Sequence, residues 1–328
     1  MLAPYVAAYS EKLDDEQIDW YTRTYYMGYV GYLLATYLGG AVVVRVFSVL
    51  SGIIYEAAKE VTEFIAEMSG MLYGSYLKAN EITLVLTGIL SMTALIPVFL
   101  IRENKEDYRN LKERNKVSFK IRMKEYFSVL LNKNARVYLI YWAFISFAMG
   151  LFTSYYTVFL NRILHIDKVT SSLMVSVSYL AIIVFMFFTP KAVRKFGEVG
   201  TIFLTMVLSV PFMLLIANGD RFGQYMIPVV GISLFIRAGL ANLSSPADSS
   251  LSMRIVPKEM RPTYTSVVNF VAGIVSILSG SFTGKILFIN PDGYRNAYYI
   301  AAILYIIAGF VILLGLHKYN RNEGLKNE

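Results

Sequence analysis

Long apolar runs constrain the fold of this 328-residue chain more than any other feature. A helix needs about 20 mostly apolar residues to cross the hydrocarbon core of a bilayer, because each residue adds only about 1.5 Å. Eight runs meet or approach this length, at residues 25–47, 82–101, 137–160, 169–189, 199–217, 226–247, 263–289 and 297–316. Lipid leaves backbone groups no outside partner, so each run predicts a spanning helix. The expected fold class is an all-α membrane protein.

The composition argues against most kinds of enzyme active site. The chain is 56% hydrophobic and 16% charged, whereas a soluble domain is roughly one quarter charged. The chain has no cysteine to supply thiolate ligands, and its two histidines are too few for most histidine-based metal sites. The sequence contains no GxxxxGK[ST], HExxH or GxSxG pattern, so neither ATP hydrolysis nor hydrolytic chemistry is supported. We therefore expect no enzymatic activity, no metal and no cofactor.

The basic residues predict an orientation in the membrane. Lys and Arg number 22 on one side of the eight runs and 7 on the other, and cytoplasmic loops carry the excess. This division places both termini in the cytoplasm of a multi-pass protein of the cell membrane. The net charge of +8 falls between apolar runs rather than along one basic face, which argues against nucleic acid as a partner.

Two segments of the chain resemble a known family. The turn 189–197 is similar to the cytoplasmic signature Gly-x-x-x-Asp-Arg-x-Gly of the major facilitator superfamily: Gly197 matches its last glycine and Lys195 its basic position, whereas Arg194 stands where the family has aspartate. The run Ser245-Pro-Ala-Asp248, followed by residues 253–261, resembles the family's junction between its tenth and eleventh helices.

The resemblance implies a domain organisation. Short similarities around residues 4–40 and 246–284 agree with the two parallel six-helix repeats of this superfamily. The chain then corresponds to helices five to twelve of a twelve-helix fold, truncated at its N-terminus, with a missing N-terminal half as an expected partner. Residues 1–101 are read as a remnant of the first bundle with an outer amphipathic helix, 102–136 as a basic cytoplasmic linker, 137–318 as the C-terminal six-helix bundle and 319–328 as a cytoplasmic tail.

The sixth run carries the strongest candidate for a substrate pathway. Arg237 lies nine residues inside Pro228, and an ionisable side chain at that depth usually faces a cavity or a partner. Ser244 and Ser245 continue a polar face along the same predicted helix, and Pro246 predicts a kink in its lower half. The alternative is that Arg237 is structural and satisfied by neighbouring helices.

Other polar and aromatic residues complete the predicted pathway. Trp142, Tyr155 and Tyr156 of the third run could stack on and hydrogen-bond a sugar or an aromatic ligand, although a packing role is equally supported for the tyrosines. Asn242 and Asn269 could line the same cavity or bond between helices.

Six further residues are assigned structural or gating roles. Gly280 and Gly284 form a GxxxG spacing that permits close helix approach. Asp248 lies near basic residues at the predicted cytoplasmic end. The remaining three are Arg261, Gly197 and Lys195.

The resemblance implies secondary active transport of a small solute by alternating access in the lipid bilayer. The aromatic and hydroxyl-rich third and sixth runs favour a polar, sugar-like solute. Efflux of drugs or metabolites, and a non-transporting membrane subunit or fragment, stay open as alternatives. Coupling to H⁺ or Na⁺ is part of the same implication.

Overall fold

The computed structural model consists of helices throughout the residues that it describes, which are 17–65, 67, 68, 70–93, 95, 96, 130–257, 260–290 and 292–320. Side chains are described from Gly28 onward. The first ten residues, most of the basic linker 102–136 and the tail beyond residue 320 lie outside this part, so the predictions made for them stay predictions.

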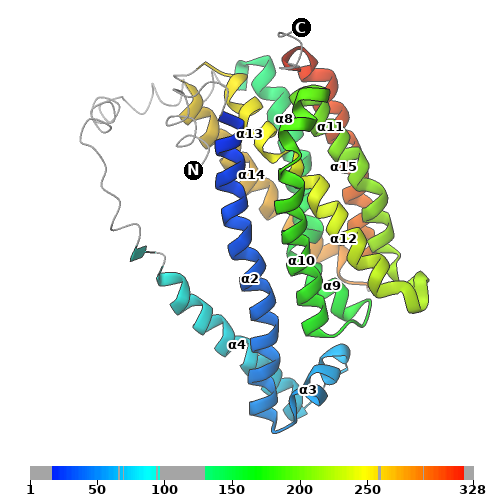
Figure 1. Cartoon of the computed structure of the whole chain (residues 1–328). Coiled ribbons are helices and arrows are strands. Elements are labelled where there is room, and N and C mark those ends of the chain that lie inside the picture. The colour runs from blue at the N-terminus through cyan, green and yellow to red at the C-terminus, as the bar shows by residue number, and fades with distance from the viewer. Residues whose placement is uncertain are drawn as a thin grey trace.

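The helices follow one another with short connections (Figure 1). In chain order they are α2 (Gln17–Ser51), α3 (Tyr55–Val61), η2 (Thr62–Phe64), α4 (Gly70–Met92), α8 (Lys133–Phe152), η4 (Thr153–Tyr155), α9 (Tyr156–Arg162), α10 (Lys168–Met186), α11 (Thr189–Ala217), η5 (Gly219–Tyr225), α12 (Met226–Leu243), α13 (Ser245–Arg254), α14 (Arg261–Phe282), the π-helical turn η7 (Thr283–Leu287), α15 (Gly293–Leu316) and η8 (His317–Tyr319).

Seven helical segments of the described part are long and apolar enough to cross a membrane, which confirms the all-α membrane fold. The expected span at residues 82–101 is the one that is not among them. Its helix, α4, begins earlier, at Gly70, and its first half includes Lys78, Asn80 and Glu81, which lower its mean hydropathy. Residues 97–101, the apolar end of that run, lie outside the described part.

Local sequence signals explain where several helices begin. Asp167 precedes α10, and its Oδ1 accepts hydrogen bonds from the backbone N–H groups of Val169 and Thr170, each at 3.0 Å. Proline occupies the first turn of α11, α13 and α14, where its missing N–H costs no hydrogen bond. The prediction of a kink at Pro246 is confirmed, because α12 ends at Leu243 and α13 begins at Ser245.

Helices α8 to α15 pack into one bundle whose core includes the fully buried rings of Tyr141, Tyr264 and Tyr298. Helix α2 lies along α10, on one side of this bundle, and α4 slants away from it (Figure 1). Helix α14 packs mainly on α8 and leaves apolar side chains uncovered, with Phe270 69% and Ile277 70% exposed. Such surfaces suit contact with lipid or with another membrane segment.

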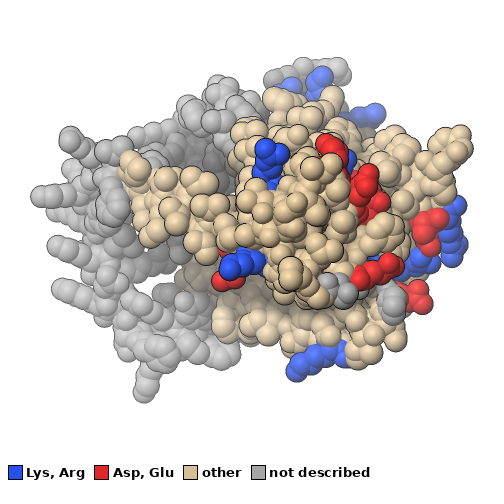
Figure 2. All heavy atoms as spheres, turned by 90° about the horizontal axis from the view of Figure 1, so that it is seen from below, with Lys and Arg blue, Asp and Glu red and all other residues tan. Residues whose placement is uncertain are grey.

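The helix in the outer connection between the first two predicted spans is short. The outer amphipathic helix expected within residues 1–101 corresponds to α3, which ends at Val61 and is followed by a 3₁₀ turn. Figure 2 looks at the end of the molecule that carries this segment: charged side chains of both signs surround a largely uncharged surface.

Candidate substrate pocket

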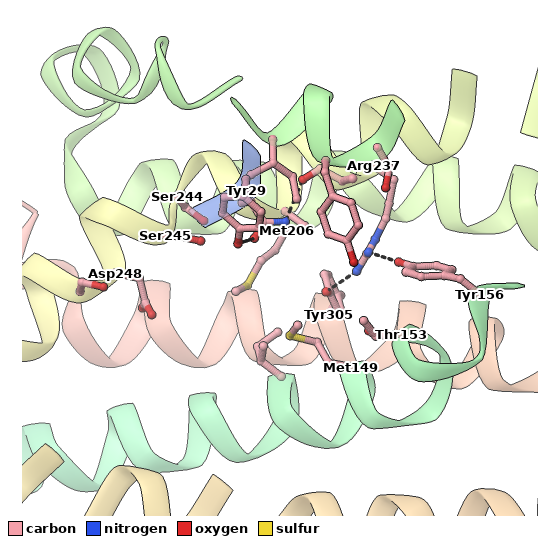
Figure 3. Close-up of a pocket in the computed structure, with 18 of the residues that line it drawn as sticks. Tyr29, Met149, Thr153, Tyr156, Met206, Arg237, Ser244, Ser245, Asp248 and Tyr305 are labelled. Atoms are coloured by element: carbon pink, nitrogen blue, oxygen red, sulfur yellow. Dashed lines mark hydrogen bonds between the residues drawn. The ribbon is translucent and has the colours of Figure 1, made fainter. Parts of the chain in front are cut away.

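A pocket of about 370 Å³ lies inside the bundle. Of the described elements, eight α-helices contribute to it, namely α2, α8 to α13 and α15, together with the 3₁₀ turn η4, and α14 does not. Figure 3 shows part of this lining. Its walls combine apolar, aromatic and hydroxyl-bearing side chains: Tyr29, Tyr141, Trp142, Ile145, Met149, Thr153, Tyr156, Val175, Ser178, Tyr179, Ile182, Met206, Arg237, Ala238, Ala241, Asn242, Ser244, Ser245, Asp248, Ser249 and Tyr305. This size and lining are typical of a site for a small molecule.

Arg237 on α12 is the cation of the pocket, and the residue is only 4% exposed. Its guanidinium donates one hydrogen bond to the hydroxyl of Tyr156 and another, of 2.7 Å, to that of Tyr305 (Figure 3). The ring of Phe152 lies 4.6 Å from the guanidinium carbon, within the range of a cation–π interaction. The Nε atom is buried and has no hydrogen-bond partner.

No described carboxylate neutralises Arg237. The two ion pairs found among described side chains join Arg254 to Glu198 and Arg295 to Asp220. Neutral hydroxyls and aromatic faces therefore surround a charge that the bilayer makes costly to bury.

Asp248 on α13 lines the same pocket, away from Arg237 (Figure 3). Its Oδ2 accepts a hydrogen bond of 3.0 Å from Tyr138, the hydroxyl of Tyr141 also interacts with this carboxylate, and the buried Oδ1 makes no hydrogen bond of ordinary geometry. The sequence placed Asp248 among structural residues, and the structure adds that it faces the pocket with unused hydrogen-bonding capacity.

The break between α12 and α13 shapes the middle of the pocket. Pro246 cannot donate to the turn before it, so the helix ends and restarts around Ser244. The hydroxyl of Thr189 donates to the carbonyl of Leu243 at 2.6 Å and satisfies one acceptor at the end of α12. Both Ser244 and Ser245 line the pocket here. The polar face predicted along one helix is thus divided between two.

A second break places Tyr156 beside Arg237. Helix α8 ends at Phe152, a 3₁₀ turn follows, and α9 begins at Tyr156. This turn also directs Tyr155 away from the pocket, where its ring packs edge-on against Phe288 with centroids 4.7 Å apart. The predicted pathway residue Tyr155 is therefore not among the pocket's lining residues, because the chain leaves α-helical geometry just before it.

Helix α2 closes one side of the pocket. The hydroxyl of Tyr29 donates to Oδ1 of Asn242 at 2.9 Å, and the Asn242 amide donates to the carbonyl of Ala238. The Tyr29 ring also stacks on Tyr179, with centroids 6.2 Å apart. Tyr29 thus lines the pocket, and the predicted pathway residue Trp142, on α8, lines it as well.

Asn269 lies apart from these residues. It is exposed on α14, a helix that contributes nothing to the pocket lining. The prediction of a pathway position is not supported for this residue, because the helix turns its polar side chain away from the interior.

The GxxxG spacing, with Gly280 in α14 and Gly284 in η7, is not a close helix contact in the described structure. A Cβ atom built on Gly280 or Gly284 meets no atom within 4 Å. The close approach lies instead at Gly150 of α8, where an added Cβ would come within 2.5 Å of Oγ of Ser279. The hydroxyl of Ser279 donates to the carbonyl of Phe147 at 2.8 Å, which fixes the two helices together.

The three remaining predicted residues lie toward the end of the bundle where the C-terminus lies. Gly197 has a φ of 73°, a conformation that favours glycine, and the side chain of Asn320 packs against it. Lys195 lies over the ring of the adjacent Phe196. Arg261 donates through Nε to the carbonyl of Met253 at 2.9 Å, which ties the start of α14 to α13.

Sequence reasoning missed one residue of the pocket, Tyr305, and one buried charge of the scaffold, Glu198. Tyr305 reaches Arg237 from α15, and a hydroxyl within so apolar a run was the available signal. Glu198, 2% exposed, joins α11 to α13 through Arg254 and Ser250. An acidic residue at the edge of an apolar run was the signal there.

The comparisons with known proteins identify the family. No curated protein and no solved structure matches the chain. A family model described as Major Facilitator Superfamily matches residues 18–280, most of the chain, including every helix that lines the pocket except α15. The chain therefore belongs to the Major Facilitator Superfamily, a family of secondary transporters.

Proposed function

We propose that this protein moves a small polar solute across the membrane by alternating access, and that the pocket around Arg237 binds the solute. Membership of the family makes it a secondary transporter of some solute. The observation that carries the proposal is a guanidinium, 4% exposed, at the wall of a pocket of about 370 Å³. An intramembrane charge without an ionic partner is characteristic of a solute pathway.

The lining favours a hydroxylated solute, in the class of sugars and their derivatives. Tyr141, Tyr179 and Trp142 offer aromatic faces, and Ser244 and Ser245 offer hydroxyls. Aromatic faces pack on the apolar faces of sugars, while hydroxyls and amides fix their orientation. Efflux of a drug or metabolite is the alternative, since Ile145, Met149 and other apolar residues share the lining.

We also propose that α2 and α4 belong to a second bundle of which this chain carries part. Helix α2 packs along α10 at the side of the pocket, and α4 leaves the main bundle (Figure 1). The DNA upstream of Met1 tests this arrangement. About four further apolar spans in frame would complete the two six-helix repeats of the family. A separate membrane gene would indicate a split transporter, and interrupted spans would indicate a remnant.

Transport by the full chain in proteoliposomes tests the proposed site. Counterflow of a radiolabelled solute is expected in the unaltered protein and is expected to be lost in Arg237→Ala. Arg295→Ala is the matched control, since Arg295 pairs with Asp220 outside the pocket lining and its loss should leave transport unchanged. Unchanged counterflow in Arg237→Ala would remove Arg237 from the site. Absence of transport in the unaltered protein, across sugars and drug-like compounds, would favour the non-transporting subunit.

A further inference from the structure

We infer that the transported solute carries an oxyanion group, a carboxylate or a phosphate, and that this group binds Arg237. The inference rests on the proposed function, because it names the chemistry of the solute that the same pocket takes. The inference narrows the proposed solutes from hydroxylated compounds in general to hydroxylated anions.

The first argument is charge balance. Arg237 is buried, and its described partners are the neutral groups of Tyr156, Tyr305 and Phe152. A tyrosine hydroxyl accepts a hydrogen bond but brings no negative charge. A guanidinium in a low-dielectric site is stabilised most by an anion, and carboxylates and phosphates match its planar fork of donors. An oxyanion of the solute supplies the negative charge that the described partners of Arg237 do not.

The second argument is the unused donors at this end of the pocket. Nε of Arg237 and Oγ1 of Thr153 are both buried without a hydrogen-bond partner. Thr153 lies three positions before Tyr156 and lines the pocket with it (Figure 3). Seven buried side-chain polar atoms of the described part lack a hydrogen-bond partner, among them Nε of Arg254 and of Arg295, and the two donors of this set that belong to pocket-lining residues lie on Arg237 and Thr153. An acceptor with several oxygen atoms satisfies such donors better than a single hydroxyl does.

The third argument is the opposite polarity of the far end. Asp248 brings no positive charge to that end, and its Oδ1 can accept a hydrogen bond from a hydroxyl of the solute. The pocket therefore orients a solute with its oxyanion toward Arg237 and its hydroxyls toward Asp248. Apolar side chains, such as those of Met149 and Ile182, also line the pocket.

Tryptophan fluorescence of the full chain tests the inference. Trp142 lines the pocket, and the chain has one other tryptophan, Trp20. In a Trp20→Phe background, all indole emission comes from Trp142. The probes are gluconate, glucose 6-phosphate and neutral glucose, titrated at constant ionic strength. We expect saturable quenching by gluconate, by glucose 6-phosphate or by both, with an affinity about tenfold or more above that for glucose. A preference for gluconate indicates a carboxylate, and one for glucose 6-phosphate a phosphate.

Substitutions of the guanidinium separate a binding role from a packing role. Arg237→Gln should reduce the affinity for the anion to that for glucose, whereas Arg237→Lys keeps the charge and should retain a weakened preference. Arg295→Gln is the matched control and should leave every titration unchanged, since Arg295 does not line the pocket. A variant that fails to fold is recognised by its gel-filtration profile, and Arg237→Lys then carries the comparison.

Each outcome decides one claim. The inference is overturned if glucose binds more tightly than both anions, if Arg237→Gln leaves anion binding unaffected, or if neither anion quenches the fluorescence. Counterflow of neutral glucose without anion binding overturns it and leaves the proposed transport intact. Anion binding that depends on Arg237, without any counterflow, supports the anion site and contradicts transport.

Discussion

The ion pair between Glu198 and Arg254 allows a prediction of stability from the structure. Glu198 is 2% exposed, and its two carboxylate oxygens accept hydrogen bonds from Ser250 at 3.0 Å and from Arg254. Arg254 also donates to the carbonyl of Tyr319 at 3.2 Å. The pair thus joins α11 and α13 to the short helix η8. We predict that Glu198→Gln destabilises the folded protein by breaking this junction.

The magnitude follows from the burial of the two partners. Removing one member of a buried ion pair costs about 3–5 kcal/mol, because the other charge is left without compensation. The Arg254 side chain is 26% exposed, so water recovers part of this loss, and we expect about 2 kcal/mol. The glutamine oxygen can keep the hydrogen bond from Ser250. At about 2–4 °C for each kcal/mol, the apparent Tm should fall by about 4–8 °C.

Thermal unfolding of the full chain in detergent measures this effect, and the chain offers a matched control. Asp220 and Arg295 also form an ion pair, at 2.7 Å, but their side chains are 43% and 21% exposed. Asp220→Asn should therefore lower Tm by no more than about 2 °C. Equal shifts in the two variants would refute the reasoning. A Glu198→Gln/Arg254→Gln double variant would also refute it if its loss of stability equalled the sum of the two single losses, since the effects of coupled residues are not additive.

Two further predictions concern packing and topology. Gly150→Ala should reduce the free energy of unfolding by about 1–3 kcal/mol and so lower Tm, because the new Cβ meets Ser279. Gly280→Ala should not lower Tm, because the space around Gly280 is open, and equal shifts would contradict the assignment of the close contact. The chain has no cysteine, so single cysteines can be introduced as labels at exposed positions. In intact cells, Tyr225→Cys should react with an impermeant thiol reagent, whereas His317→Cys should not. The reverse pattern would place the termini outside the cytoplasm.

Much of the fold was predictable because the signals are local and strong. Length and apolarity locate the spanning helices, and prolines locate several of their starts. The α4 helix was predicted less well, since the apolar run marked only its second half. Lys78 and Glu81 belong to the same helix but are polar. A hydropathy pattern locates the lipid-facing part of a helix and not its full length.

The lining of the pocket was predicted in part, and the differences have a common cause. Arg237 was found because a buried charge is conspicuous in an apolar run. Tyr155 and Tyr156 are adjacent in sequence, yet of the two only Tyr156 lines the pocket, because Tyr155 ends a 3₁₀ turn and Tyr156 begins the next α-helix. The side that Asn269 presents depends on how α14 packs on α8. Helix orientation is a tertiary property, and one sequence does not encode it in any local pattern.

The buried charges of the bundle differ in a way that separates scaffold from site. Glu198 uses both carboxylate oxygens within the protein, and its partner Arg254 is a cation. Arg237 and Asp248 instead have neutral tyrosine partners, so no described group of opposite charge compensates either of them, although Arg254, like Arg237, also keeps a buried Nε without a hydrogen-bond partner. Among the described residues, Arg237 and Asp248 are the charged residues that line the pocket. A buried charge that an opposite charge compensates stabilises the fold, whereas one with neutral partners can exchange them for a solute at small cost. Neutral tyrosines suit that exchange, because a hydroxyl that accepts from Arg237 in the empty pocket can donate to an oxyanion in the filled one.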